Sequence, residues 1–298
     1  MQSLKIYQDK LPVSVVIATL GGEVLLETLK VICSMNPKPM EVLVCMPGYK
    51  SGLTGIMDSD VSIKVIPTGV IGQVSQRAVG LSCVTQPYVL QMDDDIILQP
   101  TCLSLLFAAI NKLGPGNVVA PNCYSMVGEP ATNFSVGPQS FLHNLYQTLV
   151  YGAPWGLSKQ GKLIKSGVGY WVDVKRLGQD PFLVDWVPGG CVLSAKEDLI
   201  LDTYYPFSGK AYAEDLIHSV LWRNAGKKMW AIPLAGYSTK IEPFKFSIKE
   251  IYRNFQAHYY LVKMINGSIF RLYLWYFIFV VKNLVLIFFR CLAMVIKR

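Results

Sequence analysis

Short apolar runs of strand length alternate with longer runs of helical period over the first 120 residues. The strand-like runs, rich in Val and Ile, cover residues 13–18, 41–46, 61–66, 88–92 and 118–120. The helix-like runs between them cover residues 23–35, 71–84 and 101–113. Because strands that alternate with helices form βαβ units, this order predicts a mainly parallel sheet with helices on both faces. We therefore expect one doubly wound α/β domain over residues 1–235.

The later part of this domain has a weaker pattern. Residues 122–182 mix Gly, Pro, Asn, Ser and aromatic residues without a period, which is typical of a long functional loop. Its aromatic residues Trp155, Tyr170 and Trp171 could stack against sugar rings or belong to the core. Beyond it, the pattern predicts a helix over 213–225 and a strand over 228–232 that ends at Pro233.

The composition excludes several classes of protein. Apolar residues make up 52% of the 298 residues and charged residues 16%, the reverse of a disordered chain. Seven cysteines without a Cys-x-x-Cys pair indicate reduced thiols in the cytosol. The three histidines are too few and too scattered for a usual zinc site. Residues 1–11 contain charges and no apolar run, so we expect no signal peptide.

The positive charge is concentrated near the C-terminus. Residues 1–239 hold 18 basic and 18 acidic side chains, whereas residues 240–298 hold ten basic and two acidic ones. These basic residues alternate with Leu, Ile, Phe and Val, which favours a membrane surface over nucleic acid. We therefore expect residues 236–298 to form a helical membrane-association segment on the cytoplasmic face of the plasma membrane, peripheral or monotopic.

Two helices are expected in this segment. Ser247 and Glu250 form a capping-box pattern at the start of an amphipathic helix that ends at Asn266. A second helix over 271–296 would be about 39 Å long, enough to cross a bilayer. Its bases share an arc of about 100°, which favours a helix lying in the interface, although a spanning or a buried core helix stays open. These bases are Arg271, Lys282, Arg290 and Lys297.

The strongest chemical signal is three consecutive aspartates, Asp93, Asp94 and Asp95, directly after the apolar strand 88–92. Adjacent carboxylates raise each other's pKa unless a cation neutralises them. Asp93 and Asp95 point the same way along an extended chain and can share a pocket. Such oxygen ligands suit Mg²⁺ or Mn²⁺ bridging to substrate phosphates at the carboxyl end of a sheet. The alternative to a metal site is that the three aspartates form only a solvated turn before the next helix.

A second acidic pair, Glu214 and Asp215, opens the helix expected over 213–225. Acidic residues in a first turn favour the helix dipole by about 0.3–1 kcal/mol, so capping alone explains them. The functional alternative is a general base for an incoming hydroxyl group.

Taken in order, these motifs resemble family 2 glycosyltransferases of the GT-A fold, of the type that builds bacterial surface polysaccharides. The resemblance covers roughly residues 12–235 and implies a doubly wound mixed sheet followed by C-terminal amphipathic helices. It rests on the strand ending at Thr19, Gln73 to Arg77, the Asp triplet, Trp186 with Gly189 and Gly190, and Glu214-Asp215 followed by Arg223.

The resemblance implies inverting transfer of one sugar from a nucleotide-sugar donor to a lipid-linked saccharide acceptor. Asp93 and Asp95 match the metal-binding Asp-x-Asp, and Asp215 matches the catalytic base, with Glu214 as the alternative. The remaining matched positions contact the donor: Thr19, Gln73, Arg77, Asp94, Gly189 and Gly190. The implied cofactor is Mn²⁺ or Mg²⁺.

Two departures qualify this resemblance. The strand ending at Pro47-Gly48 lacks the acidic residue that often contacts the nucleotide base, so the donor base stays open. No Arg-Trp motif of the processive polymerases occurs in the C-terminal segment, which favours one sugar per acceptor. The other functions that the residues allow are a nucleotidyltransferase with a metal-bound Asp pair and a non-catalytic membrane-associated protein of the same fold.

Overall fold

The computed structural model describes residues 9–48, 60–130, 140–152, 160–175, 177–240 and 247–296, with side chains described as far as residue 285. The strands are β1 (Lys10–Ala18), β2 (Lys38–Met46), β3 (Ser62–Pro67), β4 (Tyr88–Met92), β5 (Ile96–Leu98), β6 (Asn117–Ser125), β7 (Phe182–Val184), β8 (Cys191–Ala195) and β9 (Lys228–Thr239). The helices are α1 (Glu23–Ser34), α2 (Gln73–Ser82), α3 (Cys102–Leu113), α4 (Phe141–Tyr151), α5 (Glu214–Asn224), α6 (Ile248–Met264) and α7 (Ile269–Ile296).

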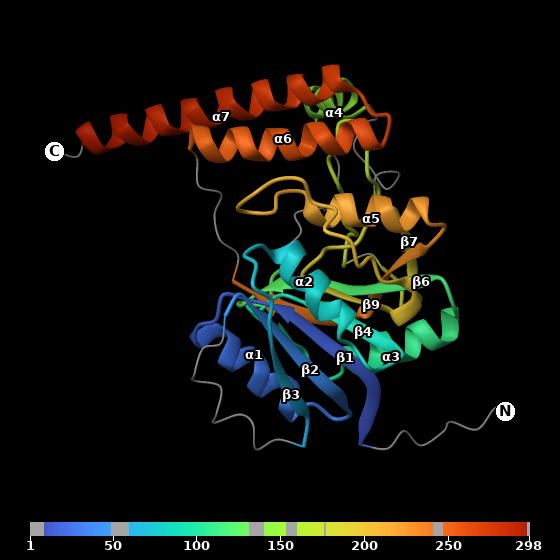
Figure 1. Cartoon of the computed structure of the whole chain (residues 1–298). Helices are drawn as coiled ribbons and strands as arrows, with labels where there is room; N and C mark the ends of the chain where they lie inside the picture. The colour runs from blue at the N-terminus through green and yellow to red at the C-terminus, as the bar shows by residue number, and fades with distance from the viewer. Residues whose placement is uncertain are drawn as a thin grey trace.

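One sheet organises the α/β part of the molecule (Figure 1). Its strand order is β3-β2-β1-β4-β8-β6-β9-β5, with β7 also paired to β9. The strands β3, β2, β1 and β4 are parallel, as the alternation predicts. The other half makes the sheet mixed, because β8 lies antiparallel between β4 and β6 while β6 and β9 are parallel. The mixed sheet that the family resemblance implies is therefore confirmed, and the expectation of a mainly parallel one is wrong. The long segment before β8, rather than a single crossover helix, allows this reversal.

The sheet buries apolar side chains on both faces. Along β1, Val15 and Ile17 pack with α1 and α3, whereas Val16 packs with α2. On that second face α5 covers β6, β8 and β9. This two-sided burial explains why β1 has a continuous apolar run rather than an alternating one. The doubly wound α/β prediction is therefore confirmed.

The predicted end of the last strand is wrong. Strand β9 continues through Pro233 to Thr239. Its register against β6 shifts between Pro121 and Asn122, so the proline lies in a bulge where its missing N–H leaves no gap in the ladder. The side chain of Asn122 donates to the carbonyl oxygens of Ile232 and Pro233, which satisfies acceptors that the bulge removes from the ladder.

Helix α4 lies within the segment that the sequence predicts to be a loop. Ser140 caps its first turn, since Ser140 Oγ accepts a hydrogen bond from the His143 N–H at 3.2 Å. Gly152, at φ 85°, ends it. The short strand β5 was also not predicted, and three residues offer too little periodicity to find it.

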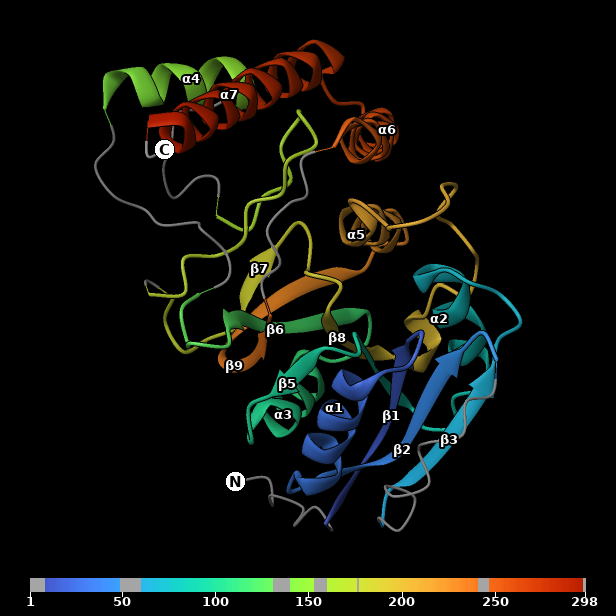
Figure 2. The ribbon, with the colours of Figure 1, turned by 90° about the vertical axis from the view of Figure 1, so that its left-hand side faces the viewer.

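Helices α4, α6 and α7 form a helical layer on the α5 side of the sheet (Figures 1 and 2). Helix α6 packs against α5 and α7, and α4 packs against α7. The predicted cap of α6 is confirmed, because Ser247 Oγ accepts from the Glu250 N–H at 3.2 Å. No helix in the described ranges is both long enough and apolar enough to cross a membrane.

The side chain of Arg271 in α7 packs closely against the C-terminal end of α4. A Cβ atom at Gly152 would lie 1.7 Å from the guanidinium nitrogen Nη1 of Arg271, so only glycine allows this close approach. A cation at the C-terminus of α4 also favours that helix's dipole. Arg271 is thus half-buried between helices, while the side chains of Arg290 and Lys297 lie outside the described residues. The boundary between residues 1–235 and 236–298 stays a prediction.

Candidate active site

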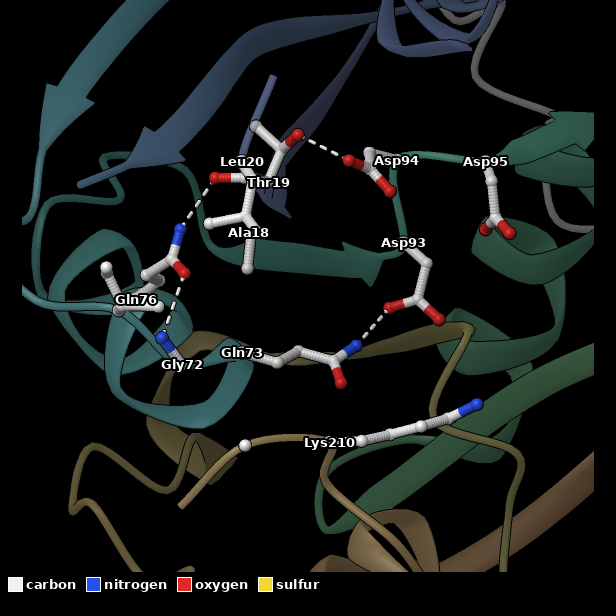
Figure 3. A pocket seen from close by; sticks show the side chains of 12 residues that line it. Ala18, Thr19, Leu20, Gly72, Gln73, Gln76, Asp93, Asp94, Asp95 and Lys210 are labelled. Atoms are coloured by element: carbon white, nitrogen blue, oxygen red, sulfur yellow. Dashed lines mark hydrogen bonds between the residues drawn. The ribbon is translucent and has the colours of Figure 1, made fainter. Parts of the chain in front are cut away.

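A pocket of about 550 Å³ lies at the carboxyl ends of β1 and β4. It is lined by the three consecutive aspartates, by Thr19 after β1 and by Gln73 at the start of α2 (Figure 3). Lys210, from the loop before α5, lies across the pocket from them (Figure 3). The pocket therefore combines three acidic groups with one basic group, at the sheet edge where open α/β folds bind ligands.

Each aspartate of the triplet has a different set of contacts. Asp93 Oδ1 accepts hydrogen bonds from Gln73 Nε2 at 2.5 Å and from Arg77 Nη2 at 2.9 Å. Asp94 accepts a hydrogen bond from the hydroxyl of Thr19. Asp95 is exposed and accepts from Thr239 Oγ1 at 3.3 Å. Asp93 and Asp94 are thus held by the protein, while Asp95 faces solvent.

Helix α2 is fixed to this edge by a buried glutamine. Gln76 Nε2 donates to the carbonyl oxygens of Thr19, at 2.7 Å, and Cys45, at 2.9 Å. The Gln76 side-chain oxygen accepts from the Gly72 N–H at 3.1 Å. Gly72 itself has φ 139°, a conformation that favours glycine. These bonds set the position from which Gln73 and Arg77 reach Asp93.

Arg77 connects the two acidic motifs. Its guanidinium lies 2.9 Å from Asp93 Oδ1 and 3.5 Å from Glu214 Oε1. Arg77 and Glu214 are buried, and Glu214 also accepts a hydrogen bond from the hydroxyl of Tyr204. Burial raises the pKa of Asp93 to about 6, although Arg77 beside it acts in the opposite direction. The motifs are 120 residues apart in sequence but share one buried ion-pair network.

Gly189 and Gly190 lie between the two motifs. A Cβ atom at Gly189 would lie 3.1 Å from Glu214 Oε2 and 3.2 Å from Asp215 Cβ. A Cβ atom at Gly190 would lie 3.5 Å from Asp93 Oδ2. The Gly190 carbonyl also accepts from the Asp93 N–H at 2.9 Å. The absence of side chains here lets the Asp93 and Asp215 regions approach each other.

Asp215 has the properties of a proton acceptor near neutral pH. Burial and the adjacent Glu214 carboxylate raise the pKa of Asp215 to about 7. Its Oδ1 accepts from the Leu216 N–H at 2.9 Å. Glu214, in contrast, is buried, forms an ion pair with Arg77 and accepts a hydrogen bond from the hydroxyl of Tyr204. Of the two predicted candidates for the base, Asp215 is the more accessible.

The structure thus brings together every residue predicted for the site. Thr19, Gln73 and the aspartates line the pocket, and the rest lie behind them: Arg77, Gly189, Gly190, Glu214 and Asp215. Their roles stay predictions. Lys210 and Tyr204 were not predicted, because a single residue in an aperiodic loop has no sequence signal and only the chain path places it.

The three aromatic residues proposed to stack against sugar rings lie in different environments. Trp171 is 2% exposed, packs on Trp186 and donates from Nε1 to Asn122 Oδ1 at 3.3 Å, so it belongs to the core. Tyr170 is half-buried, and its hydroxyl donates to Gln147 Oε1 at 3.2 Å. Trp155 lies outside the described residues.

The acidic pocket offers a divalent cation only one or two protein ligands. Within the described ranges, no group of three or more His, Cys, Asp or Glu side chains is arranged to hold a metal ion. Mg²⁺ and Mn²⁺ sites often need only one or two carboxylates, because substrate phosphates complete them. Asp95 fits such a ligand. Oδ1 of Asp93 is already bound by Arg77 and Gln73.

Comparison with known families identifies the first half of this site. The model of Glycosyl transferase family 2 matches residues 14–146. This segment belongs to that family. It contains Thr19, Gln73, Arg77 and the Asp triplet, and the predicted family is confirmed. The match stops before Gly189 and Glu214, so these two motifs rest on the geometry above.

Solved structures extend the comparison to the fold. A crystal structure of GalNAc-T7 with UDP, GalNAc and Mn²⁺ matches with a TM-score of 0.52 at 12% identity, covering 82% of this chain and 47% of that chain. The chain thus spans about half of GalNAc-T7, and the GT-A fold is confirmed. Two S. aureus TarS structures match with TM-scores of 0.49 at 14% identity, covering 87% of this chain and 67% and 40% of theirs. No curated protein matches significantly.

Proposed function

We propose that the protein is an inverting glycosyltransferase that moves one sugar from a nucleotide-sugar donor to a lipid-linked saccharide in surface polysaccharide synthesis. The observation that carries the proposal is the network from Asp93 through Arg77 to Glu214, which joins the acidic pocket to Asp215. A pocket for a nucleotide diphosphate and a carboxylate of raised pKa therefore lie at one sheet edge.

In the proposed reaction Asp215 accepts the proton of the acceptor hydroxyl group. The acceptor oxygen then forms a bond to the anomeric carbon while the bond from that carbon to the donor diphosphate breaks. The electron pair leaves with the nucleoside diphosphate, and a single displacement inverts the anomeric configuration. General-base assistance of this kind contributes about 10²–10⁴-fold in rate.

The other residues would bind and orient the donor. Thr19, Gln73 and Asp94 face the pocket from β1, α2 and the end of β4, and Lys210 supplies a positive charge for phosphate oxygens. Mn²⁺ or Mg²⁺, held by Asp95 with Asp93 beside it, would neutralise charge on the leaving diphosphate. The Mn²⁺ in the GalNAc-T7 structure supports this expectation.

Nucleotide binding is the first test. UDP, GDP, dTDP and CMP, each with and without Mn²⁺, are compared by thermal shift on wild type and Asp95→Asn. A ligand at 100 times its Kd adds about 2.7 kcal/mol to the stability of the folded state. We expect stabilisation by one nucleotide that depends on Mn²⁺ and is lost in Asp95→Asn. Asp202→Asn, an exposed aspartate outside the pocket, is the matched control.

Product analysis then separates the alternatives. A glycosyltransferase releases a nucleoside diphosphate, whereas a nucleotidyltransferase releases pyrophosphate. No nucleotide-dependent shift and no transfer from a broad donor panel would instead favour a non-catalytic protein of this fold, bound to the cytoplasmic face of the membrane.

A further inference from the structure

Two further pockets continue from the donor pocket, the first next to it and the second next to the first. The first, of about 210 Å³, lies between the loop before α5 and helix α6. The second, of about 520 Å³, is a groove between α6 and α7. Figure 1 shows that the loop before α5 lies beneath the start of α6, between the sheet and the helical layer.

The small pocket is basic and shares a wall with the donor pocket. Lys210 lines both pockets, and Arg253 of α6 lines the small one. Gly209 lies in the shared wall, where an added Cβ atom would lie 3.1 Å from Arg253 Nη1. Glu250 lies 3.6 Å from Arg253 and also accepts a hydrogen bond from the hydroxyl of Tyr212. The described charged side chains that line this pocket are both cationic, which suits a phosphate group.

The groove between α6 and α7 is apolar. Its lining includes Ile251, Tyr252 and Phe255 from α6 and Tyr273, Phe277 and Val280 from α7. Phe277 is 67% exposed and Tyr252 59%, so large apolar surfaces are open to a ligand. Gln256 of the basic pocket donates to the hydroxyl of Tyr252 at 3.0 Å, which makes the two pockets direct neighbours.

We propose that the basic pocket and the groove bind the phosphate and the hydrocarbon chain of a lipid-linked acceptor, whose saccharide then extends toward Asp215. The order of the pockets, from polar through cationic to apolar, matches the order of sugar, phosphate and hydrocarbon in such a molecule. This inference rests on the proposed function and specifies its acceptor. The groove then binds the hydrocarbon chain of the acceptor rather than bulk membrane lipid.

Binding of farnesyl diphosphate to the full chain tests the inference without catalysis. By isothermal titration we expect Arg253→Gln to weaken binding by about tenfold or more, the size of one charge-assisted hydrogen bond. The matched control is Lys249→Gln, which removes an equal charge from an exposed position on α6. It should stay within about twofold of wild type, a change too small for a lost charged contact.

The groove is tested with two phenylalanines on one face of α7. Phe277→Glu puts a carboxylate into the groove, whereas Phe270, 75% exposed, lies one heptad earlier and does not line it. Phe277→Glu should weaken farnesyl diphosphate binding by about tenfold or more, the transfer value of one buried aromatic side chain, and Phe270→Glu should not. Equal effects of the two variants within either pair would overturn the inference, because the binding of farnesyl diphosphate would then not depend on these two pockets.

Ligand fragments distinguish the sources of binding. Pyrophosphate and farnesol should each bind more weakly than farnesyl diphosphate, and pyrophosphate binding as tight as farnesyl diphosphate would overturn the role of the groove. Sugar transfer to a lipid-free saccharide without farnesyl diphosphate binding would overturn this inference alone. Farnesyl diphosphate binding without transfer to any acceptor would overturn only the proposed function. Thermal unfolding of each variant verifies its fold.

Discussion

The α/β part and the helical layer distribute charged and apolar side chains in opposite ways. Around the sheet, Arg77 and Glu214 are buried and paired, and apolar side chains fill both faces. In the helical layer, Phe141 of α4 and Phe270 of α7 are 79% and 75% exposed. The first arrangement holds charges in fixed positions for a polar ligand. The second leaves apolar surface for contact with a partner of low polarity.

The contrast extends to buried histidines. His218 of α5 lies near Arg77 and Glu214, and burial lowers its pKa to about 3. His258 of α6 contacts Tyr276 and Trp275, and burial lowers its pKa to about 4. Both are neutral at pH 7. The charges of the buried network therefore come from its carboxylates and Arg77.

The largest expected effect concerns Asp215. Replacing Asp215 by Asn should lower kcat by about 10²–10⁴-fold, because the acceptor hydroxyl loses its base. Nucleotide binding, measured by titration calorimetry, should change little. Asp202→Asn is the control, since this exposed carboxylate precedes the same helix without touching the site. A variant Asp215→Asn with normal kcat would remove the catalytic contrast between the two parts of the molecule.

The buried network predicts a large stability effect. Arg77→Met should lower the free energy of unfolding by about 3–5 kcal/mol, because the carboxylates of Asp93 and Glu214 lose their shared cation. Lys162→Met removes a half-exposed partner of Asp185 and should cost less than about 1 kcal/mol. Urea unfolding measures both. Similar losses would mean that the buried network does not organise the α/β part.

These two predictions rely on residues that the sequence identified to different extents. The strands and helices up to α3, apart from β5, were predictable, because each has a strong apolar period. The Asp triplet was predictable as a candidate site because it directly follows an apolar strand. The link from Asp93 through Arg77 to Glu214 was not, because ion pairs between distant segments leave no local pattern.

The helical layer shows the same limit. The cap of α6 and the length of α7 follow from Ser247, Glu250 and an apolar run. Helix α4 was missed although Ser140 and Gly152 mark its ends, because its exposed apolar side chains hide the helical period. The packing of Gly152 against Arg271 and the groove beside Phe277 depend on how separate helices meet, which no single segment encodes.

A membrane role of the helical layer predicts an intermediate effect. Leu142 of α4 is 74% exposed, and Leu142→Glu should reduce partition onto anionic phospholipid vesicles by about tenfold, the order expected for one leucine side chain. Leu201→Glu is the control, because Leu201 is 52% exposed in the α/β part. Vesicle sedimentation measures both. Equal losses would show that exposed apolar residues of the two parts contribute alike.

The pH dependence gives the smallest expected effect and separates the two parts without mutation. Because the pKa of Asp215 is raised to about 7, kcat/KM should rise about tenfold between pH 6 and pH 8 as the base loses its proton. The same raised pKa lowers stability as pH increases from about 4 to about 7, since the unfolded carboxyl group releases its proton first. Activity and the Asp215 contribution to stability therefore change in opposite directions.

Asp215→Asn should remove this contribution from the stability profile while keeping the fall at low pH that comes from the buried histidines His218 and His258. That fall has the opposite sign: a histidine whose pKa is lowered to about 4 destabilises the folded protein as pH decreases from about 6.5 toward 4. Urea unfolding of wild type, Asp215→Asn and His258→Gln across pH 4–8 resolves the two. A profile unchanged by Asp215→Asn would show that burial around this carboxylate does not set its protonation, and the base of the reaction would have to be sought elsewhere in the site.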